Sequence, residues 1–341
     1  MKKAYKTILL SLTMLICTFS LASCTQSLSI PDNTTDVGYN PSGYDSSHDD
    51  STIDLPAEPL PLTQTPALPI ILTPIASGAR VEQNEKAKID YSNAADGYVM
   101  VMWLVETTRD LKVQVTGPSE AVYTYTIYPN NEFNALPLSD GNGSYAVRVY
   151  EQNDEGRYFL VLSLSLDVTL VDEFAPFLRP NKFVNFNESN HVVRKAAELV
   201  AGKNSFIDKI EAVYSFVIDN FDYDVSLAES ILAGTTTTYI PDLDAVYDSR
   251  IGICFDYAAV MTAMLRSQGI PTKMVFGYAD DVRHAWINVF SEETGWVDQV
   301  IFFDGENWIF MDPTFASAAG NASALQQFIG DGSRYTATHL Y

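Results

Sequence analysis

The stretch GICFDYA at residues 252–258 decides the fold of the C-terminal half of the chain. Its glycine allows the backbone to turn sharply immediately before a helix. Cys254, Ala258, Met261 and Leu265 then recur at helical spacing, so their side chains share one face. The pattern predicts a buried helix that runs to Gln268 and has Cys254 in its first turn.

A cysteine in the first turn of a helix is suited to nucleophilic chemistry. The exposed N–H groups and the helix dipole favour a thiolate and can hold a developing oxyanion. His284 begins a predicted strand, and Asp312 precedes Pro313, which favours an extended backbone at the aspartate. Cys254, His284 and Asp312 therefore follow the order nucleophile, base and orienting carboxylate. A small buried cysteine with a structural histidine and aspartate is the alternative that these residues alone leave open.

Three segments together resemble the transglutaminase-like superfamily, whose catalytic domain has a papain-like fold. They are residues 252–258 around Cys254, residues 283–286 around His284, and residues 311–314 around Asp312. The resemblance implies a Cys254-His284-Asp312 triad in an α+β domain over residues 172–341. Asp256, Tyr257 and Trp286 are similar to the usual neighbours of such a site.

The resemblance implies acyl transfer at peptide or protein amides through a thioester on Cys254. Water as the acceptor would give a peptidase or deamidase, and an amine would give a transglutaminase; the triad leaves this choice open, and a cysteine peptidase is the activity that we expect. A second oxyanion donor could come from an upstream aromatic residue, either Tyr239 or Tyr247. The resemblance carries over no calcium loop, and we expect no cofactor and no metal. The histidines show neither zinc spacing nor an H-E-x-x-H motif.

The segment before this domain has the period-two alternation of β-strands. Leu111, Val113 and Val115 alternate with polar residues, and similar runs recur between turn-forming segments such as Asp140–Gly143. Six or seven short strands over residues 80–171 predict an antiparallel β-sandwich, of the immunoglobulin-like kind. From residue 172 onward the pattern changes, which indicates α+β. Helices are predicted at 190–201 and 205–221, and strands at 272–278, 284–290, 296–303 and 308–311.

The N-terminus has the pattern of a secretion signal, with three lysines before an apolar stretch. The sequence Leu-Ala-Ser-Cys at residues 21–24 resembles the lipobox of bacterial lipoproteins, which implies a signal peptide over 1–23 and lipidation of Cys24. Residues 24–79 are acidic and proline-rich and contain no Lys or Arg, which predicts a disordered linker. We therefore expect the protein to be lipid-anchored on the extracellular face of the bacterial cell membrane.

Charge restricts the function further. The chain has 21 Lys+Arg against 43 Asp+Glu, a formal net charge of −22, which argues against nucleic acid as a partner. The expected function is that of a cell-surface cysteine enzyme acting on a peptide or protein substrate. The alternative is a catalytically silent transglutaminase-like surface module that binds cell-wall or protein partners.

Overall fold

The computed structural model describes residues 70–292, 295–297, 302–303, 308–309 and 335–341. The predicted signal peptide, Cys24, most of the predicted linker and Asp312 lie outside these residues. Residues 66–341 form one compact unit, so the predicted domain boundary at residue 172 stays a prediction. No helix within the described residues is both long enough and apolar enough to cross a membrane.

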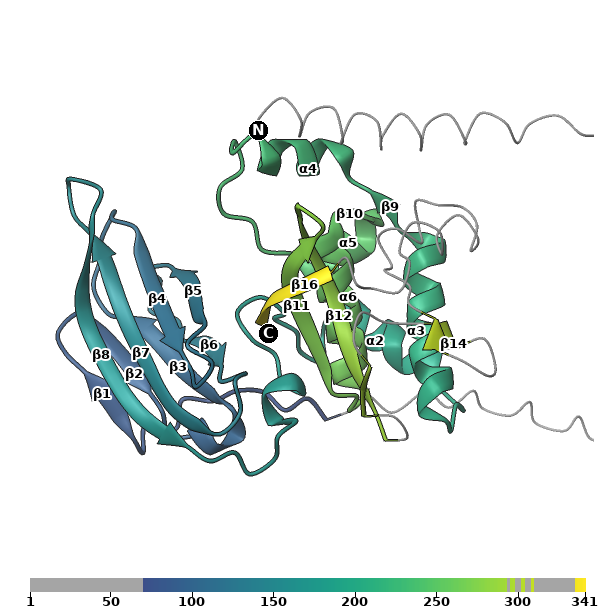
Figure 1. The fold of residues 1–341 in the computed structure, drawn as a ribbon, viewed down its shortest axis with the longest axis horizontal. Coiled ribbons are helices and arrows are strands. Elements are labelled where there is room, and N and C mark those ends of the chain that lie inside the picture. Colours follow the sequence, from purple (N-terminus) through teal and green to yellow (C-terminus); the bar gives the residue numbers. More distant parts are fainter. Residues whose placement is uncertain (1–69, 293–294, 298–301, 304–307, 310–334) are drawn as a thin grey trace, which may run out of the picture. The chain divides into compact units, whose positions relative to one another are not determined.

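The segment predicted as β contains two four-stranded sheets, and every strand pair in them is antiparallel (Figure 1). The first sheet has the order β1 (Val81–Gln83), β2 (Ala87–Asp90), β3 (Tyr98–Trp103), β6 (Asn134–Pro137). The second has the order β5 (Val122–Ile127), β4 (Leu111–Thr116), β7 (Gly143–Gln152), β8 (Tyr158–Val168). Antiparallel strands are confirmed here, whereas an immunoglobulin-like sandwich stays a prediction.

The alternating pattern marks the buried face of the second sheet. Leu111, Val113 and Val115 are buried in β4, whereas Lys112 and Gln114 are only partly buried. Buried residues of both sheets belong to the same hydrophobic cluster. The apolar half of each alternation therefore supplies the common core.

A charged pair joins the two sheets at the edge of this core. Glu151 of β7 is only 3% exposed, and its carboxylate accepts hydrogen bonds from Lys86 Nζ (2.6 Å) and Thr107 Oγ1 (3.2 Å). Lys86, which directly precedes β2, also places its ammonium 5.9 Å from the ring centroid of Trp103. The lysine therefore compensates a carboxylate that has lost its hydration.

Replacing Lys86 with methionine should lower the free energy of unfolding by about 2 kcal/mol, because Glu151 would stay buried with one neutral donor. Urea unfolding at pH 7 measures the loss. The double variant Lys86→Met/Glu151→Gln should recover most of it. Lys195→Met is the control, since it breaks a surface ion pair to Glu198 and a 5.4 Å contact with the Phe216 ring, and should change stability by less than about 1 kcal/mol. Equal stability of Lys86→Met and the native protein would contradict this account.

The C-terminal segment combines helices with an antiparallel sheet, as predicted. Its helices are α2 (His191–Val200), α3 (Phe206–Asn220), α4 (Val225–Leu232), α5 (Leu243–Ser249) and α6 (Cys254–Ser267). The main sheet has the order β13 (Gly295–Val297), β12 (Val282–Ser291), β11 (Thr272–Ala279), β16 (Tyr335–Leu340). Two short pairs complete the described strands: β9 (Asp222–Tyr223) with β10 (Ile251–Gly252), and β14 (Phe302–Phe303) with β15 (Trp308–Ile309).

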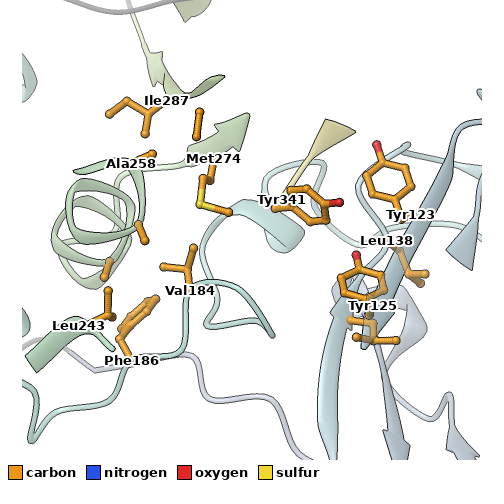
Figure 2. Close-up of a cluster of buried hydrophobic side chains, with 14 of the residues drawn as sticks. Tyr123, Tyr125, Leu138, Val184, Phe186, Leu243, Ala258, Met274, Ile287 and Tyr341 are labelled. Atoms are coloured by element: carbon orange, nitrogen blue, oxygen red, sulfur yellow. The ribbon is translucent and has the colours of Figure 1, made fainter. Parts of the chain in front are cut away.

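Helix α6 packs against β11 and β12, with α2, α3 and α5 around its other sides (Figure 1). Ala258 from the helix and Met274 and Ile287 from the sheet lie in the same buried cluster (Figure 2). Helix α3 has a side-chain cap, since Ser205 Oγ accepts from the N–H of Asp208 at 3.0 Å. Of these helices, only the short α4 and α5 were not predicted.

Tyr341 packs against rings of the preceding β-rich segment. Its ring lies 5.5 Å from that of Tyr123 and 5.9 Å from that of Tyr125, both edge-on (Figure 2). Phe183 stacks on Tyr125 at 5.3 Å and meets Tyr341 at 4.7 Å. Edge-to-face and offset-stacked ring pairs contribute more to stability than the burial of their apolar area alone would give.

Candidate active site

Cys254 is the first residue of α6, and its side chain is half-buried. It is the only free cysteine among the described residues. At this position the thiol lies beside main-chain N–H groups that have no acceptor within the helix. These groups and the positive end of the helix dipole can stabilise the negative charge that develops when the sulfur attacks a carbonyl group.

The chain reaches Cys254 through the short parallel pair of β9 and β10. Gly252 O accepts from the N–H of Asp224, and Arg250 O accepts from the N–H of Asp222, both at 2.8 Å. A Cβ at Gly252 would lie 2.5 Å from the Cβ of Asp256, closer than real Cβ contacts. The glycine in the motif is thus required by the close approach of the α6 first turn.

Arg250 directly precedes β10 and is held in place by aromatic rings. Its backbone is left-handed (φ 58°), and its guanidinium carbon lies 3.7 Å from the ring centroid of Tyr247 and 4.9 Å from that of Phe216. Phe221 completes the aromatic surround at 5.2 Å. Cation–π attraction is strongest where the cation has left water. The ring of Tyr247 therefore takes part in holding Arg250.

Asp256 is fully buried in the first turn of α6. Its carboxylate accepts from the N–H of Ile253 and from the hydroxyl of Tyr239, each at 2.7 Å. Burial raises the pKa of Asp256, and the two hydrogen bonds act in the opposite direction. The pKa of Tyr239 is raised too, first by burial and then by its bond to Asp256. Because the one hydroxyl proton of Tyr239 is donated to Asp256, this geometry assigns the tyrosine to the helix cap and not to an oxyanion.

Replacing Tyr239 with phenylalanine should lower the free energy of unfolding by about 1.5–3 kcal/mol at pH 7, because a buried carboxylate loses a donor. The folded-state pKa of Asp256 lies above its unfolded value, so its contribution to stability falls as pH rises from the unfolded to the folded value. Loss of the Tyr239 bond raises that pKa further, so the deficit should grow with pH across this window. Urea unfolding from pH 4 to 7 tests this.

Tyr128→Phe is the matched control for this prediction, since Tyr128 is exposed and its hydroxyl has no partner among the described residues. It should leave stability within about 0.5 kcal/mol of the native value. A Tyr239→Phe deficit that is the same at pH 4 and pH 7 would show that Asp256 does not respond to the tyrosine.

His284 lies near the start of β12 and is 8% exposed. Its ring is nearly parallel to that of Trp286 at 6.2 Å between centroids, and Tyr335 of β16 approaches it edge-on at 6.0 Å. Gly277 faces His284 in the register of β11 and β12. A Cβ on Gly277 would overlap the main-chain oxygen of Thr336 in β16 and lie 2.5 Å from the Cη2 of Trp286, so both neighbours require a glycine here.

The topology places Cys254 and His284 at the same end of the domain. Helix α6 leads away from Cys254, and the antiparallel return of β11 brings the chain back toward that end of the domain. Strand β12 begins there beside the end of β11, and His284 lies opposite Gly277 in the register. Phe255, next to Cys254, packs edge-on against Phe276 at 4.8 Å. The start of the helix is therefore close to the histidine-bearing end of the sheet.

The remaining predicted neighbours are buried around these two residues. Tyr257 is fully buried in α6, and its ring lies 5.9 Å from that of Phe221. Trp286 is also buried and contacts Tyr335 edge-on at 5.3 Å. No group of three His, Cys, Asp or Glu side chains suited to a metal ion occurs among the described residues.

Arg250, Gly277 and Tyr335 were missed as residues that shape the site. Each acts through partners distant in the sequence, and no local pattern marks them. A glycine inside a predicted strand can indicate a close approach, which is the one signal that Gly277 carried.

Comparison with known proteins finds similarity in this part of the chain. A family model described as the transglutaminase-like superfamily matches residues 193–313. A protein-glutamine gamma-glutamyltransferase of Pseudomonas aeruginosa is 28% identical over 109 residues, which cover 28% of this chain and 14% of that protein. An uncharacterised protein of Mycobacterium leprae is 27% identical over 141 residues, covering 38% of this chain and 46% of that protein. The chain thus spans less than half the length of either relative.

Two solved structures are also similar, at low scores. A protein described as a candidate cysteine protease of Cytophaga hutchinsonii aligns with a TM-score of 0.36 and 14% identity, covering 77% of this chain and 74% of that one. Red sea bream transglutaminase aligns with a TM-score of 0.26 and 13% identity, covering 64% and 48%. The family match is the stronger finding: residues 193–313, which contain Cys254 and His284, match the model of the transglutaminase-like superfamily.

Proposed function

We propose that this protein is a cysteine enzyme that performs acyl transfer at peptide or protein amides. Cys254 is the nucleophile, His284 the general base and acid, and Asp312 the group that orients His284. The carrying observation is the position of Cys254: a half-exposed thiol at the first residue of α6, at the same end of the domain as His284. A buried structural cysteine would need neither the helix start nor the exposure.

The proposed reaction has two steps. The Cys254 thiolate attacks the carbonyl carbon, and main-chain N–H groups of the first turn stabilise the oxygen anion. The C–N bond then breaks, and protonated His284 gives its proton to the leaving amine, which leaves a thioester on Cys254. Water or a second amine attacks the thioester, loses its proton to His284 and releases the thiolate.

The surroundings of His284 support transfer in a partly dehydrated site. The rings of Trp286 and Tyr335 flank the imidazole, which is itself largely buried. Exclusion of water strengthens electrostatic interactions and favours an amine over water as acceptor. The name of the Pseudomonas aeruginosa relative, a glutamyltransferase, supports the same choice, so amine transfer is the first reaction to assay.

We also propose that a lipid on Cys24 holds the enzyme at the extracellular face of the membrane, where its substrates would be cell-wall or surface proteins. The support is the lipobox-like sequence at residues 21–24. Metabolic labelling with an alkyne fatty acid should mark the native protein and not the Cys24→Ala variant. Equal labelling of both would contradict the anchor.

Alkylation by iodoacetamide tests the nucleophile. Cys254 in the folded protein should react at pH 7 at least about tenfold faster than in the urea-unfolded chain, because the helix start stabilises its thiolate. Peptide mapping by mass spectrometry assigns the label to Cys254 rather than to Cys17 or Cys24. Slower alkylation in the folded state would contradict the proposal and favour the non-catalytic surface module.

A further inference from the structure

A second candidate site lies outside the residues proposed for catalysis. It is a cleft of about 630 Å³, bounded by the segment around β6, the segment before α2 and the start of α5. This volume is in the range of ligand sites. Neither Cys254 nor His284 lines it. Six of its lining residues are asparagines: Asn130, Asn134, Asn181, Asn185, Asn187 and Asn190.

Two of these amides are held in place by the protein. Asn134 accepts from Lys182 Nζ at 2.7 Å and donates to the main-chain oxygens of Val101 and Glu132. Asn190 accepts from the N–H of Asn187 at 2.8 Å and donates to Asp244 at 3.0 Å. Such fixed amides present a preformed surface to a ligand.

Other groups in the cleft retain hydrogen-bonding capacity. Asn187 uses its Oδ1 to accept from Ser189, which leaves the two hydrogens on Nδ2 without a partner among the described residues. Asn185 is exposed, and its amide has no partner in the described part of the chain. Lys182 has two further ammonium hydrogens besides the one donated to Asn134.

Asn181 is a different case, because it is only 5% exposed. Its Oδ1 accepts from the N–H groups of Phe183 and Val184, each at 3.0 Å, whereas its Nδ2 is buried without a partner. A buried amide donor without an acceptor costs about 1–3 kcal/mol. A ligand or water oxygen that enters this wall of the cleft would remove that cost.

The walls also contain apolar groups. Phe133 is partly exposed and lines the cleft together with the buried Phe186 and with Pro241. Aromatic rings pack against the C–H faces of sugar rings, while neutral amides donate to and accept from their hydroxyls. Glu132 and Asp242 also line the cleft, and their carboxylates can accept hydrogen bonds from hydroxyls while repelling an anion. Amides and carboxylates beside an aromatic ring thus match a neutral ligand rich in hydroxyl groups.

A peptide strand fits this cleft less well. Strand β6 is at the edge of its sheet, but its Ala135 oxygen already accepts from the N–H of Lys182 at 2.9 Å. Addition of a peptide strand needs a free row of main-chain groups at such an edge. We propose that the cleft binds a neutral oligosaccharide. This site is separate from the proposed function, and its ligand need not react at Cys254.

Isothermal titration calorimetry of the full chain tests the proposal, with cellohexaose, maltohexaose and hexa-N-acetylchitohexaose, all uncharged, as probes. At least one should bind. The double variant Asn185→Ala/Asn187→Asp should weaken it at least about tenfold, because it removes donors but keeps the Oδ1 that orders residues 187–189. Asn204→Asp is the matched control, being exposed and outside the cleft, and should change affinity less than twofold.

Three results would overturn the proposal. They are the absence of binding by all three probes, equal affinity in the double variant and the native protein, and displacement of a bound probe by a short glutamine-containing peptide. The Cys254→Ala variant separates this test from the proposed function, since it should bind the oligosaccharide with unchanged affinity. Iodoacetamide reactivity tests the thiol independently of any sugar.

Discussion

Replacing Cys254 with alanine is expected to lower acyl transfer by a factor of at least about 10³ while leaving the fold intact. Without the sulfur no thioester can form, and the helix N–H groups alone retain only weak catalysis. Alanine suits the first turn of α6, and the half-buried position leaves little cavity behind. The rate is measured as incorporation of a labelled primary amine into a glutamine-containing protein, together with release of ammonia.

Two further variants make this result specific. Cys254→Ser keeps the size and polarity of the side chain but should remain at least about 10²-fold slower, since a hydroxyl is far less acidic than a thiol. Cys24→Ala, the control at a cysteine outside the proposed site, should leave the rate of the purified protein within twofold. Full activity in Cys254→Ala, with unchanged thermal unfolding, would remove the proposed nucleophile.

The start of α6 could be predicted because its determinants are local. A glycine, a cysteine and a run of apolar residues at helical spacing lie within one short stretch, and the helix begins within one residue of the expected position. The resemblance of the same stretch also led to the family, which the match to residues 193–313 confirms. Cys254 and His284, the proposed nucleophile and base, lie on α6 and β12, which pack against each other although β11 separates them in the chain.

The support around the motif could not be predicted in the same way. Asp256 contacts Tyr239, which lies 17 residues earlier in the chain. Arg250 lies against the rings of Phe216 in α3, Phe221 directly after α3 and Tyr247 in α5. Such contacts depend on how helices pack, which a local pattern does not encode. Helices α4 and α5 are short, and α4 has no buried residue, so neither shows the long apolar stripe that identifies a helix.

In the β-rich segment, alternation identified strands but not their partners. The buried residues of β4 and β7 follow the period of two that a one-sided sheet requires. However, β6 pairs with β3 rather than with its neighbour in sequence, β5. Turn signals set where strands end, whereas sheet order depends on the shared core.

The largest expected effect on stability concerns Arg266, near the end of α6. It is 3% exposed, and its guanidinium donates to the main-chain oxygens of Thr272 (2.9 Å), Arg179 (2.8 Å) and Tyr341 (2.6 Å). Burial lowers the pKa of Arg266 to about 9. One side chain thus joins α6 to β11, to the segment before α2 and to the end of β16.

Arg266→Met should lower the free energy of unfolding by about 3–5 kcal/mol, because three buried carbonyl oxygens lose a charged donor at once. Arg266→Lys should recover only part of this loss, since an ammonium cannot reproduce the planar geometry of the guanidinium. Arg157→Met is the control: its exposed pairing with Glu155 contributes little, so stability should change by less than about 0.5 kcal/mol. Urea unfolding measures all three. If Arg266→Met unfolds at the same urea concentration as Arg157→Met, the carbonyls must find other donors, and Arg266 would not be what holds α6, β11 and β16 together.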